Sequence, residues 1–460
     1  MGIRFDDTNL RARMVGAKHG LTDTEIAAAV PLAAKALAGF RALYNTGEVG
    51  FPDLPKGGDE VNKILAYAGK VKGSYDTVCV VGIGGSALGA WALDCGLRGP
   101  HPVQNASPRL VILDNVDPEF IGLALRSMNP KKTIVVPIAK SGATAETVAT
   151  FLIVKKWLED GIGAAKAKQR IVVVTSEGRG DLKVLATREG YTTFHLPNNV
   201  GGRFSVLSAV GLVPAALAGF DVKKLLKGAA EMTKAAWSDD LSVNTPLRAA
   251  MLHWLFIKNK KKPMQVAFPY SNRLWGTAFW FRQLWAESIG KARDRKGKLV
   301  NTGQTPIAAL GTTDQHSQVQ LYMEGPNDKV FTFWAVAKPR ENATVPPEKI
   351  GLEGFDYLCG KTMSKLLDAE RRSTEAALAE NERPNCTFTL DRVDEEHLGA
   401  FFQLMEFETA FAGEFLNINA FDQEGVELGK KFTFGLMGRK GEQHQQFRDR
   451  FAAYEARRKA

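Results

Sequence analysis

Residues 131–147, KKTIVVPIAKSGATAET, decide the fold of this chain. Residues 133–137 are an apolar, β-branched run with the length of a buried strand. The strand leads through the loop at 140–144 into residues 145–160, which have a helical pattern. Free backbone N–H groups and the positive end of a helix dipole favour an anion at such a turn, and a glycine lets the ligand approach the backbone. The stretch alone leaves an anion-binding turn and an ordinary strand–helix loop equally open.

Strand-to-loop units of the same kind flank this stretch on both sides. Further strand patterns begin at residue 77 and cover 109–115, 170–178 and 192–197, with helical patterns between them. The spacing suits βαβ crossovers, which generate a parallel sheet. A second alternating set has strands at 264–272, 305–310 and 329–336 and an aromatic-rich helix at 274–288. We therefore predict an α/β fold with two doubly wound parallel-sheet subdomains.

Both ends of the chain are predicted to be helical arms. Within residues 1–46, the sequence TDTE at 22–25 fits a capping box, and Pro31 is expected to end a turn or kink the helix. Residues after about 395 have a helical pattern again. The expected domains are a helical N-terminal arm (1–50), a first α/β subdomain (51–220), a second α/β subdomain (221–395) and a C-terminal helical segment (396–460).

Composition places the chain among globular proteins with more than one domain. It has 460 residues, a formal net charge of +10 and a pI near 9.3, which suits an anionic substrate without specifying one. Lysine and arginine are spread along the chain, and no basic stripe interleaved with aromatic residues indicates nucleic acid. No HExxH or other ligand spacing indicates a metal.

The sequence also predicts a cytoplasmic protein with no membrane partner. Asp6 and Asp7 stand where a signal peptide needs an apolar region. The longest apolar-looking run, 206–220, contains Ser208 and Pro214 and is too short to cross a bilayer. The four cysteines lie far apart without a CxxC pair, so we expect reduced thiols in the cytosol.

A glycine-rich turn, GIGGSA at 82–87, follows the strand that begins at residue 77. It matches the G-x-G-x-x-G/A pattern of dinucleotide-binding sites, so an NAD-dependent dehydrogenase is one candidate function. Asp114 ends the next strand, but it lies further along than the roughly 20 residues that such sites use. Ser86 also places a hydroxyl inside the turn, where a ligand can meet it.

Three further side chains have the chemistry of a proton-transfer site. Glu287 falls in the last turn of the aromatic helix, where the negative helix end and apolar neighbours favour proton uptake, as a general base requires. Arg203 follows two glycines, so its guanidinium can lie over a ligand and stabilise an oxyanion. His316 lies in a polar loop after a strand, where α/β active sites gather. Taken singly, each is more often a structural or surface group.

Six motifs occur in order along most of the chain. They are GIGGSALG (82–89), AKSGATAET (139–147), VGGRFSVLS (200–208), QLWAESIGK (283–291), GTTDQHSQ (311–318) and FDQEGVELGKK (421–431). In this order they resemble the phosphoglucose isomerase (glucose-6-phosphate isomerase) family, and the length resembles its shorter bacterial branch.

The resemblance implies a fold, a reaction and an assembly. The fold is two sugar-isomerase α/β subdomains with helical arms, usually assembled as a homodimer. The reaction is reversible aldose–ketose isomerisation of glucose 6-phosphate and fructose 6-phosphate through a cis-enediol(ate), in glycolysis and gluconeogenesis, without a cofactor. The alternatives are the NAD-dependent dehydrogenase and a non-catalytic sugar-phosphate-binding protein; the presence of Glu287, Arg203 and His316 together argues against the second.

The resemblance also assigns roles to individual residues. Glu287 matches the base that moves a proton between C1 and C2, and Arg203 matches the group that stabilises the enediolate. His316 and Lys430 match the pair that assists ring opening, with the histidine supplied by the partner subunit. The remaining matches are polar substrate contacts at Gln283 and Gln423, a phosphate cradle of Ser86, Lys140, Ser141 and Thr144, and Gly85 as a further substrate-binding position.

Four positions depart from the family pattern. Ala139 and Ala143 stand where the family commonly has Ser and Thr, so two hydroxyls are expected to be missing around the phosphate. Leu207 replaces a frequent aromatic residue, and Ile289 replaces a frequent Asn beside the base. These departures bear on affinity and on the range of sugars rather than on the type of reaction.

Overall fold

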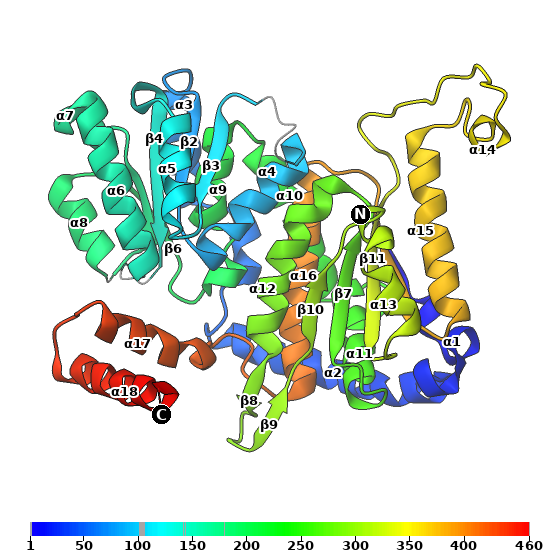
Figure 1. The fold of residues 1–460 in the computed structure, drawn as a ribbon. Coiled ribbons are helices and arrows are strands. Elements are labelled where there is room, and N and C mark those ends of the chain that lie inside the picture. Colours follow the sequence, from blue (N-terminus) through cyan, green and yellow to red (C-terminus); the bar gives the residue numbers. More distant parts are fainter. Residues whose placement is uncertain (1, 101–105, 141, 143, 179, 460) are drawn as a thin grey trace.

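Two five-stranded sheets with helices between and around them form the body of the chain (Figure 1). The computed structural model describes residues 2–100, 106–140, 142, 144–178 and 180–459. The predicted α/β class with two mainly parallel sheets is confirmed.

The first sheet is parallel throughout, with the strand order β3-β2-β4-β5-β6. Its strands are β2 (Thr77–Val81), β3 (Arg109–Leu113), β4 (Thr133–Ala139), β5 (Val172–Ser176) and β6 (Thr192–Leu196). Its helices are α3 (Asp59–Val71), α4 (Leu88–Arg98), α5 (Pro118–Ser127), α6 (Ala145–Ile162), α7 (Ala164–Lys168), α8 (Asp181–Glu189) and α9 (Ala209–Ala218). Every residue of β2, β4 and β5 is buried, as their continuous apolar runs predict for a sheet covered on both faces.

The second sheet has the order β1-β12-β11-β7-β10 and is parallel except at its edge strand. Its strands are β1 (Ile3–Asp6), β7 (Met264–Pro269), β10 (Thr305–Ala308), β11 (Lys329–Val336) and β12 (Asn385–Leu390). Its helices are α1 (Ala12–His19), α2 (Asp23–Asn45), α10 (Val222–Ala236), α11 (Thr245–Lys258), α12 (Trp275–Ile289), α13 (Val319–Glu324), α14 (Glu353–Asp356), α15 (Met363–Glu380) and α16 (Glu395–Leu416). The prediction that residues 1–46 are helical is wrong at 3–6, because β1 pairs antiparallel with β12.

One pair of helices and a small ribbon complete the chain. The antiparallel ribbon β8 (Lys291–Arg293) and β9 (Leu299–Thr302) follows α12 directly. At the C-terminus, α17 (Glu427–Leu436) and α18 (Glu442–Lys459) pack against each other, and Figure 1 shows this pair, the C-terminal arm, beside the body of the molecule. Short 3₁₀ turns that carry site residues are η3 (Gly84–Ser86), η5 (Gly202–Phe204), η7 (Thr313–His316) and η8 (Glu424–Val426).

Helix α2 shows how the N-terminal segment is attached. The predicted capping box is confirmed: the Thr22 side chain accepts from the Glu25 backbone N–H at 3.1 Å, and Glu25 accepts from the Thr22 N–H at 2.8 Å. Pro31 does not end the helix, which runs from Asp23 to Asn45. Among the described residues, α2 alone meets the length and composition of a membrane span, but its Leu37 and Phe40 lie in the main apolar core.

The main core lies between the two sheets and joins them. One apolar cluster contains Val78 and Val80 of the first sheet together with Trp334 and Phe388 of the second. Helices α4, α10, α12 and α16 occupy this central layer (Figure 1). Because one core is shared, the strand-end loops of the first sheet and the end of α12 are held in a fixed relation.

Helices α10 and α16 approach each other so closely that two glycines are required at their contact. A Cβ atom on Gly228 would lie 1.8 Å from the Glu396 carbonyl oxygen. A Cβ atom on Gly399 would likewise lie 1.8 Å from the Leu225 carbonyl oxygen. Backbone cannot yield as a flexible side chain can, so the two helices would have to move apart.

Gly399→Ala should therefore lower the free energy of unfolding by about 1–3 kcal/mol, the usual effect of overpacking a core. Gly69→Ala is the matched control, because Gly69 lies on exposed α3 and a Cβ there would meet nothing within 4 Å. That control should gain up to about 1 kcal/mol from higher helix propensity. Urea denaturation of both variants checks this, and equal stability of Gly399→Ala and the unaltered protein would contradict the packing described.

Candidate active site

The carboxyl edge of the first sheet gathers the loops that the sequence singled out. The glycine turn η3 packs directly on η5, because a Cβ atom on Gly85 would lie 2.3 Å from the carbonyl of Gly202. Gly84 has φ +57°, and a Cβ there would lie 2.8 Å from Nε2 of Gln283. The glycines therefore allow backbone and the α12 side chain to meet at the turn. Gly85, Gly202 and Gln283, all from predicted motifs, are brought together.

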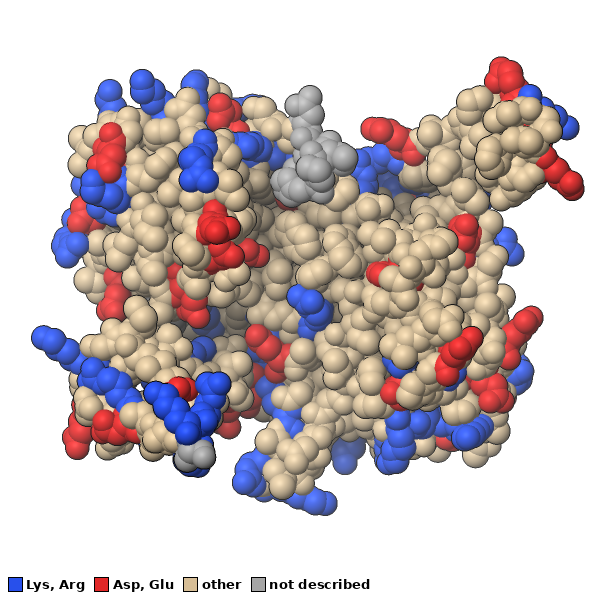
Figure 2. Space-filling view, in the orientation of Figure 1, with Lys and Arg blue, Asp and Glu red and all other residues tan. Residues whose placement is uncertain are grey.

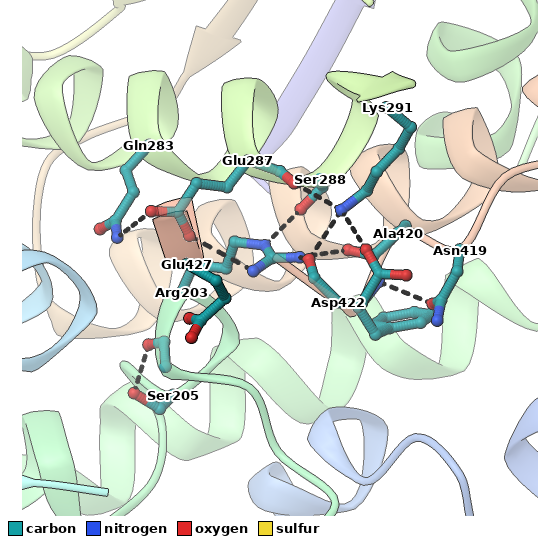
Figure 3. Close-up of polar contacts among 12 residues, drawn as sticks. Arg203, Ser205, Gln283, Glu287, Ser288, Lys291, Asn419, Ala420, Asp422 and Glu427 are labelled. Carbon is teal, nitrogen blue, oxygen red and sulfur yellow. Dashed lines mark hydrogen bonds and ion pairs between the residues drawn. The ribbon is translucent and has the colours of Figure 1, made fainter. Parts of the chain in front are cut away.

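Arg203 is the centre of this site (Figure 3). Its side chain is 2% exposed, and its Nε donates to the Ser288 hydroxyl at 2.7 Å. Nη1 donates to the Glu287 carboxylate at 3.3 Å, while Nη2 donates to the backbone carbonyls of Ala420 at 2.6 Å and Asp422 at 2.8 Å. Burial lowers the pKa of Arg203, and the nearby Glu287 and Asp422 carboxylates oppose that shift. The guanidinium thus joins α12 to the segment before η8.

Glu287 keeps access to solvent while its carboxylate is held from two sides. Its side chain is 30% exposed, and its second carboxylate oxygen accepts from Nε2 of Gln283 at 3.1 Å. Gly290 is the C-cap residue of α12. Besides the helix end and the apolar neighbours that the sequence indicates, the structure places the Arg203 guanidinium against this carboxylate.

Two residues that the sequence analysis did not single out complete the cluster. Lys291 donates to the Glu287 carbonyl at 2.9 Å, to the Asp422 carbonyl at 2.7 Å and to the Asp422 carboxylate at 2.6 Å (Figure 3). Both residues belong to the motifs that carried the resemblance, QLWAESIGK and FDQEGVELGKK. Their pairing spans 131 positions, so no local pattern could have shown it.

The predicted phosphate cradle is described only in part. Ser141 and Ala143 lie outside the described residues. Thr144 is the N-cap residue of α6, which begins at Ala145, and Ser86 ends η3. Lys140 donates to the backbone carbonyls of Asn198 and Val200, each at 2.8 Å. Its half-buried ammonium therefore supports the segment that leads into η5, and burial lowers its pKa.

Ala139 proves to be a core position. Its side chain is 2% exposed and lies in an apolar cluster with Cys79 and Val135 on the outer side of the first sheet. Its carbonyl accepts from the Thr175 hydroxyl at 2.7 Å, and the Lys140 carbonyl accepts from Ser176 at 2.9 Å. The side chain of Ala139 packs in this core, and the effect of its missing hydroxyl on phosphate binding stays a prediction.

Lys430 and Gln423 lie on the segment that follows the Arg203 contacts, and both are exposed. Gln423 comes immediately after Asp422, at the start of η8. Lys430 lies on α17 and forms an ion pair with Glu427 at 2.8 Å. The structure thus connects these residues to the Arg203 cluster through the chain, but it shows no contact of Lys430 with Glu287 among the described residues.

His316 lies at the other end of the second sheet from Glu287. The Gly311 N–H donates to the carbonyl of Pro269, the last residue of β7, and α12 begins shortly after that residue. The turn η7, which carries His316, follows Gly311 in the chain. Glu287 is in the last turn of α12, whose 15 residues span roughly 20 Å at about 1.5 Å per residue. The structure does not bring His316 and Glu287 of one chain together.

The loop around His316 is nevertheless well anchored. Gln315 accepts from the Tyr270 hydroxyl and donates to Glu370, each at 2.8 Å, and Asp314 accepts from the Leu310 N–H at 2.7 Å. The His316 side chain itself is exposed. A rigid loop therefore presents this histidine to the outside of the subunit.

A buried guanidinium, an accessible carboxylate and strand-end loops at the edge of a parallel sheet define this chain as an α/β enzyme. A model of the phosphoglucose isomerase family matches residues 61–449. A glucose-6-phosphate isomerase from Carboxydothermus hydrogenoformans is 41% identical over 414 residues, which cover 88% of each chain. Another from Rubrobacter xylanophilus is 42% identical over 398 residues, 85% of this chain and 90% of that one.

Solved structures agree with these relatives. A hypothetical protein from Thermus thermophilus superposes with a TM-score of 0.85 at 36% identity, covering 95% of this chain and 100% of the other. A glucose-6-phosphate isomerase from Chlamydia trachomatis superposes with a TM-score of 0.74 at 26% identity, covering 86% of this chain and 76% of the other. The chain belongs to the phosphoglucose isomerase family. This result replaces the dehydrogenase alternative that the glycine turn had suggested.

Proposed function

We propose that this chain interconverts glucose 6-phosphate and fructose 6-phosphate at the site around Arg203 and Glu287. The observation that carries the proposal is the contact between the two: a buried guanidinium lies 3.3 Å from a carboxylate that is 30% exposed. An aldose–ketose isomerisation needs one base to move a proton between neighbouring carbons and one cation to stabilise the enediolate oxygen. This pair supplies both groups at one place.

Glu287 is proposed to take the proton from one carbon and return it to the other. Its exposure leaves room for the substrate, and Gln283 orients one of its oxygens. Arg203 Nη1 carries two N–H groups, and Glu287 takes one of them. The other is proposed to meet the developing oxyanion, while four hydrogen bonds hold the guanidinium still. Gln423 is proposed to contact the sugar from the segment that Arg203 anchors.

The phosphate is proposed to bind at the carboxyl edge of the first sheet. Gly85 and Ser86 in η3, with Lys140, Ser141 and Thr144 around the start of α6, would supply N–H, O–H and ammonium donors. The amino end of α6 favours negative charge. Lys140 donates two N–H groups to the carbonyls of Asn198 and Val200, so its third N–H can meet a phosphate oxygen.

Basic side chains on the C-terminal arm support an anionic substrate. Figure 2 shows Lys and Arg gathered over this arm at the lower left of the molecule. The exposed bases include Lys430, Lys431, Arg450, Arg457 and Arg458. A positive field raises the local concentration of a dianion and its rate of encounter. Lys430 is proposed to assist ring opening from this arm.

A homodimer is proposed because His316 and Glu287 of one subunit lie at opposite ends of the second sheet and do not meet at one site. The anchored η7 loop presents it outward, where a second subunit could receive it. The segment 338–361 supports a partner as well: it projects from the body in Figure 1 and exposes Ile350, Phe355 and Tyr357 at 69%, 57% and 67%. Exposed apolar residues on a projecting segment are typical of a protein interface.

A cytoplasmic location is proposed from the thiols. Cys79, Cys95 and Cys386 are buried and Cys359 is half-buried, and all four are free. Burial raises the pKa of the Cys79 thiol to about 12, so it stays protonated and unreactive. Free, inert thiols suit a reducing compartment.

Glu287→Gln should keep the fold and reduce turnover by about 10²–10⁴, the usual contribution of a positioned base. A coupled assay that converts fructose 6-phosphate to glucose 6-phosphate measures this, with mannose 6-phosphate as the specificity control. Glu324→Gln is the matched variant, because Glu324 is an exposed glutamate in the last turn of another helix, and it should be fully active. Near-normal turnover of Glu287→Gln would remove it from the role of base; no turnover by the unaltered protein would leave only a sugar-phosphate-binding protein.

Inorganic phosphate should inhibit competitively with fructose 6-phosphate, because it can occupy the cradle alone. Ser141→Ala and Ser86→Ala should each raise the inhibition constant about tenfold, the value of a hydrogen bond to a charged group. Ser242→Ala, an exposed serine in a turn before α11, is the control and should leave the constant unchanged. An unchanged inhibition constant in both cradle variants would show that the phosphate binds elsewhere.

Mixed dimers test whether His316 acts across the interface. Glu287→Gln and His316→Ala homodimers should both be nearly inactive. After subunit exchange at equal amounts, half of the dimers are hybrids, and each hybrid has one site with both residues intact, so about a quarter of the full activity should return. If His316 acts within its own subunit, every site remains defective and the mixture stays inactive.

A further inference from the structure

Lys291 uses all of its hydrogen-bonding capacity inside the site. Its ammonium donates to the Glu287 carbonyl, the Asp422 carbonyl and the Asp422 carboxylate, at 2.9, 2.7 and 2.6 Å. An ammonium has three N–H groups, so three acceptors saturate it. Its side chain is only 10% exposed. Burying an ammonium is unfavourable unless acceptors surround it, so this arrangement fixes the side chain in one position.

The first of these bonds acts on the helix that carries the proposed base. Lys291 begins β8, immediately after Gly290 ends α12. Its ammonium turns back onto the Glu287 carbonyl, one of the carbonyls in the last turn of that helix. A cation at a helix C-terminus is favoured by the dipole, and here it also ties the backbone of Glu287 in place.

The other two bonds act on the segment that leads to the C-terminal arm. Asp422 immediately precedes Gln423, and its carbonyl accepts from both Lys291 and Arg203. Beyond it, α17 packs on α18 and η8, through ring contacts such as Phe432 with Phe447. Because the arm packs chiefly on itself, its placement depends on the segment that these two cations hold.

We propose that Lys291 is a positioning residue that locks the Glu287 end of α12 to the segment carrying Gln423 and Lys430. The inference rests on the proposed function, because the groups that Lys291 positions are the ones assigned to that reaction. Lys291 does not need to touch the substrate, because its donors are already used within the protein. Arg203 fixes the same segment from the other side, so the two cations act as a pair on the Asp422 carbonyl.

Lys291→Met tests this, since it keeps most of the side-chain volume and removes the three donors. The kcat for fructose 6-phosphate should fall about 10–100-fold, because small misplacements of reacting groups have effects of that size. The KM should change less than threefold, as the phosphate cradle is untouched. Hydrogen exchange measured by mass spectrometry should become faster at residues 417–436 and stay unchanged at 77–81.

Two further variants make the test decisive. Lys296→Met removes an exposed lysine from the turn between β8 and β9 and should alter neither kcat nor exchange. Asp422→Ala removes one acceptor from a side chain that is 36% exposed, so it should fold normally and show a smaller effect of the same kind. The double variant Lys291→Met/Asp422→Ala should be no worse than Lys291→Met alone, because the bond that Asp422→Ala removes is already lost in Lys291→Met.

Several outcomes would overturn the proposal. Unchanged kcat in Lys291→Met would do so, as would a loss accompanied by faster exchange throughout the first sheet. If Lys291→Met does not fold, normal kcat and normal exchange at 417–436 in Asp422→Ala would reject it. An unaltered protein that does not isomerise fructose 6-phosphate would reject the proposed function instead, while the exchange measurement would still report on the lock.

Discussion

The need to pair one buried guanidinium organises the site of this enzyme. Arg203 is 2% exposed, and an unpaired charge in that position would be strongly destabilising. Its partners come from the end of α12, through Glu287 and Ser288, and from the segment before η8, through Ala420 and Asp422. These partners lie 84 to 219 positions away from it in sequence. The hydrogen bonds of this one side chain therefore fix the positions of three segments, distant in sequence, relative to one another.

The surrounding structure makes that pairing possible. Gly85 lets η3 lie against Gly202, next to Arg203, and Lys140 holds the carbonyls of Asn198 and Val200 just before it. Neither contact touches the guanidinium, yet both limit where its backbone can lie. The shared core between the sheets then fixes α12 opposite this turn. The site is rigid because its supports belong to the fold rather than to a flexible loop.

Much of the fold could be predicted from the sequence, namely the segments in which burial alone determines the pattern of apolar residues. Strands β4 and β11 are largely apolar and buried, and both begin at the predicted residue. Strand β1 was missed because four residues, IRFD, become a strand only by pairing with β12, a tertiary contact that local pattern does not contain. Pro31 was expected to interrupt α2, but the capping box and the buried Leu37 and Phe40 outweigh one missing hydrogen bond.

The site was predictable as a set of residues but not as a network. The resemblance assigned Arg203, Glu287 and Gln283 to one site, and the structure places them in contact. It did not show Lys291 with Asp422, nor that the Lys140 ammonium supports backbone. It also did not show that the side chain of Ala139 packs in the core. A motif gives residue types in order, whereas the direction of each side chain depends on contacts made across the whole chain.

The contact between Arg203 and Glu287 places one cation beside the groups that change charge in the proposed reaction. In the proposed reaction, the carboxylate loses its negative charge on taking the proton, and the substrate oxygen gains one at the same step. Arg203 donates one Nη1 N–H to Glu287 and has a second N–H on the same nitrogen. One guanidinium can therefore contact both the carboxylate and the enediolate oxygen. Its other bonds, to Ser288, Ala420 and Asp422, hold the guanidinium in place. The guanidinium can therefore stabilise the developing oxyanion without reorganisation of the site.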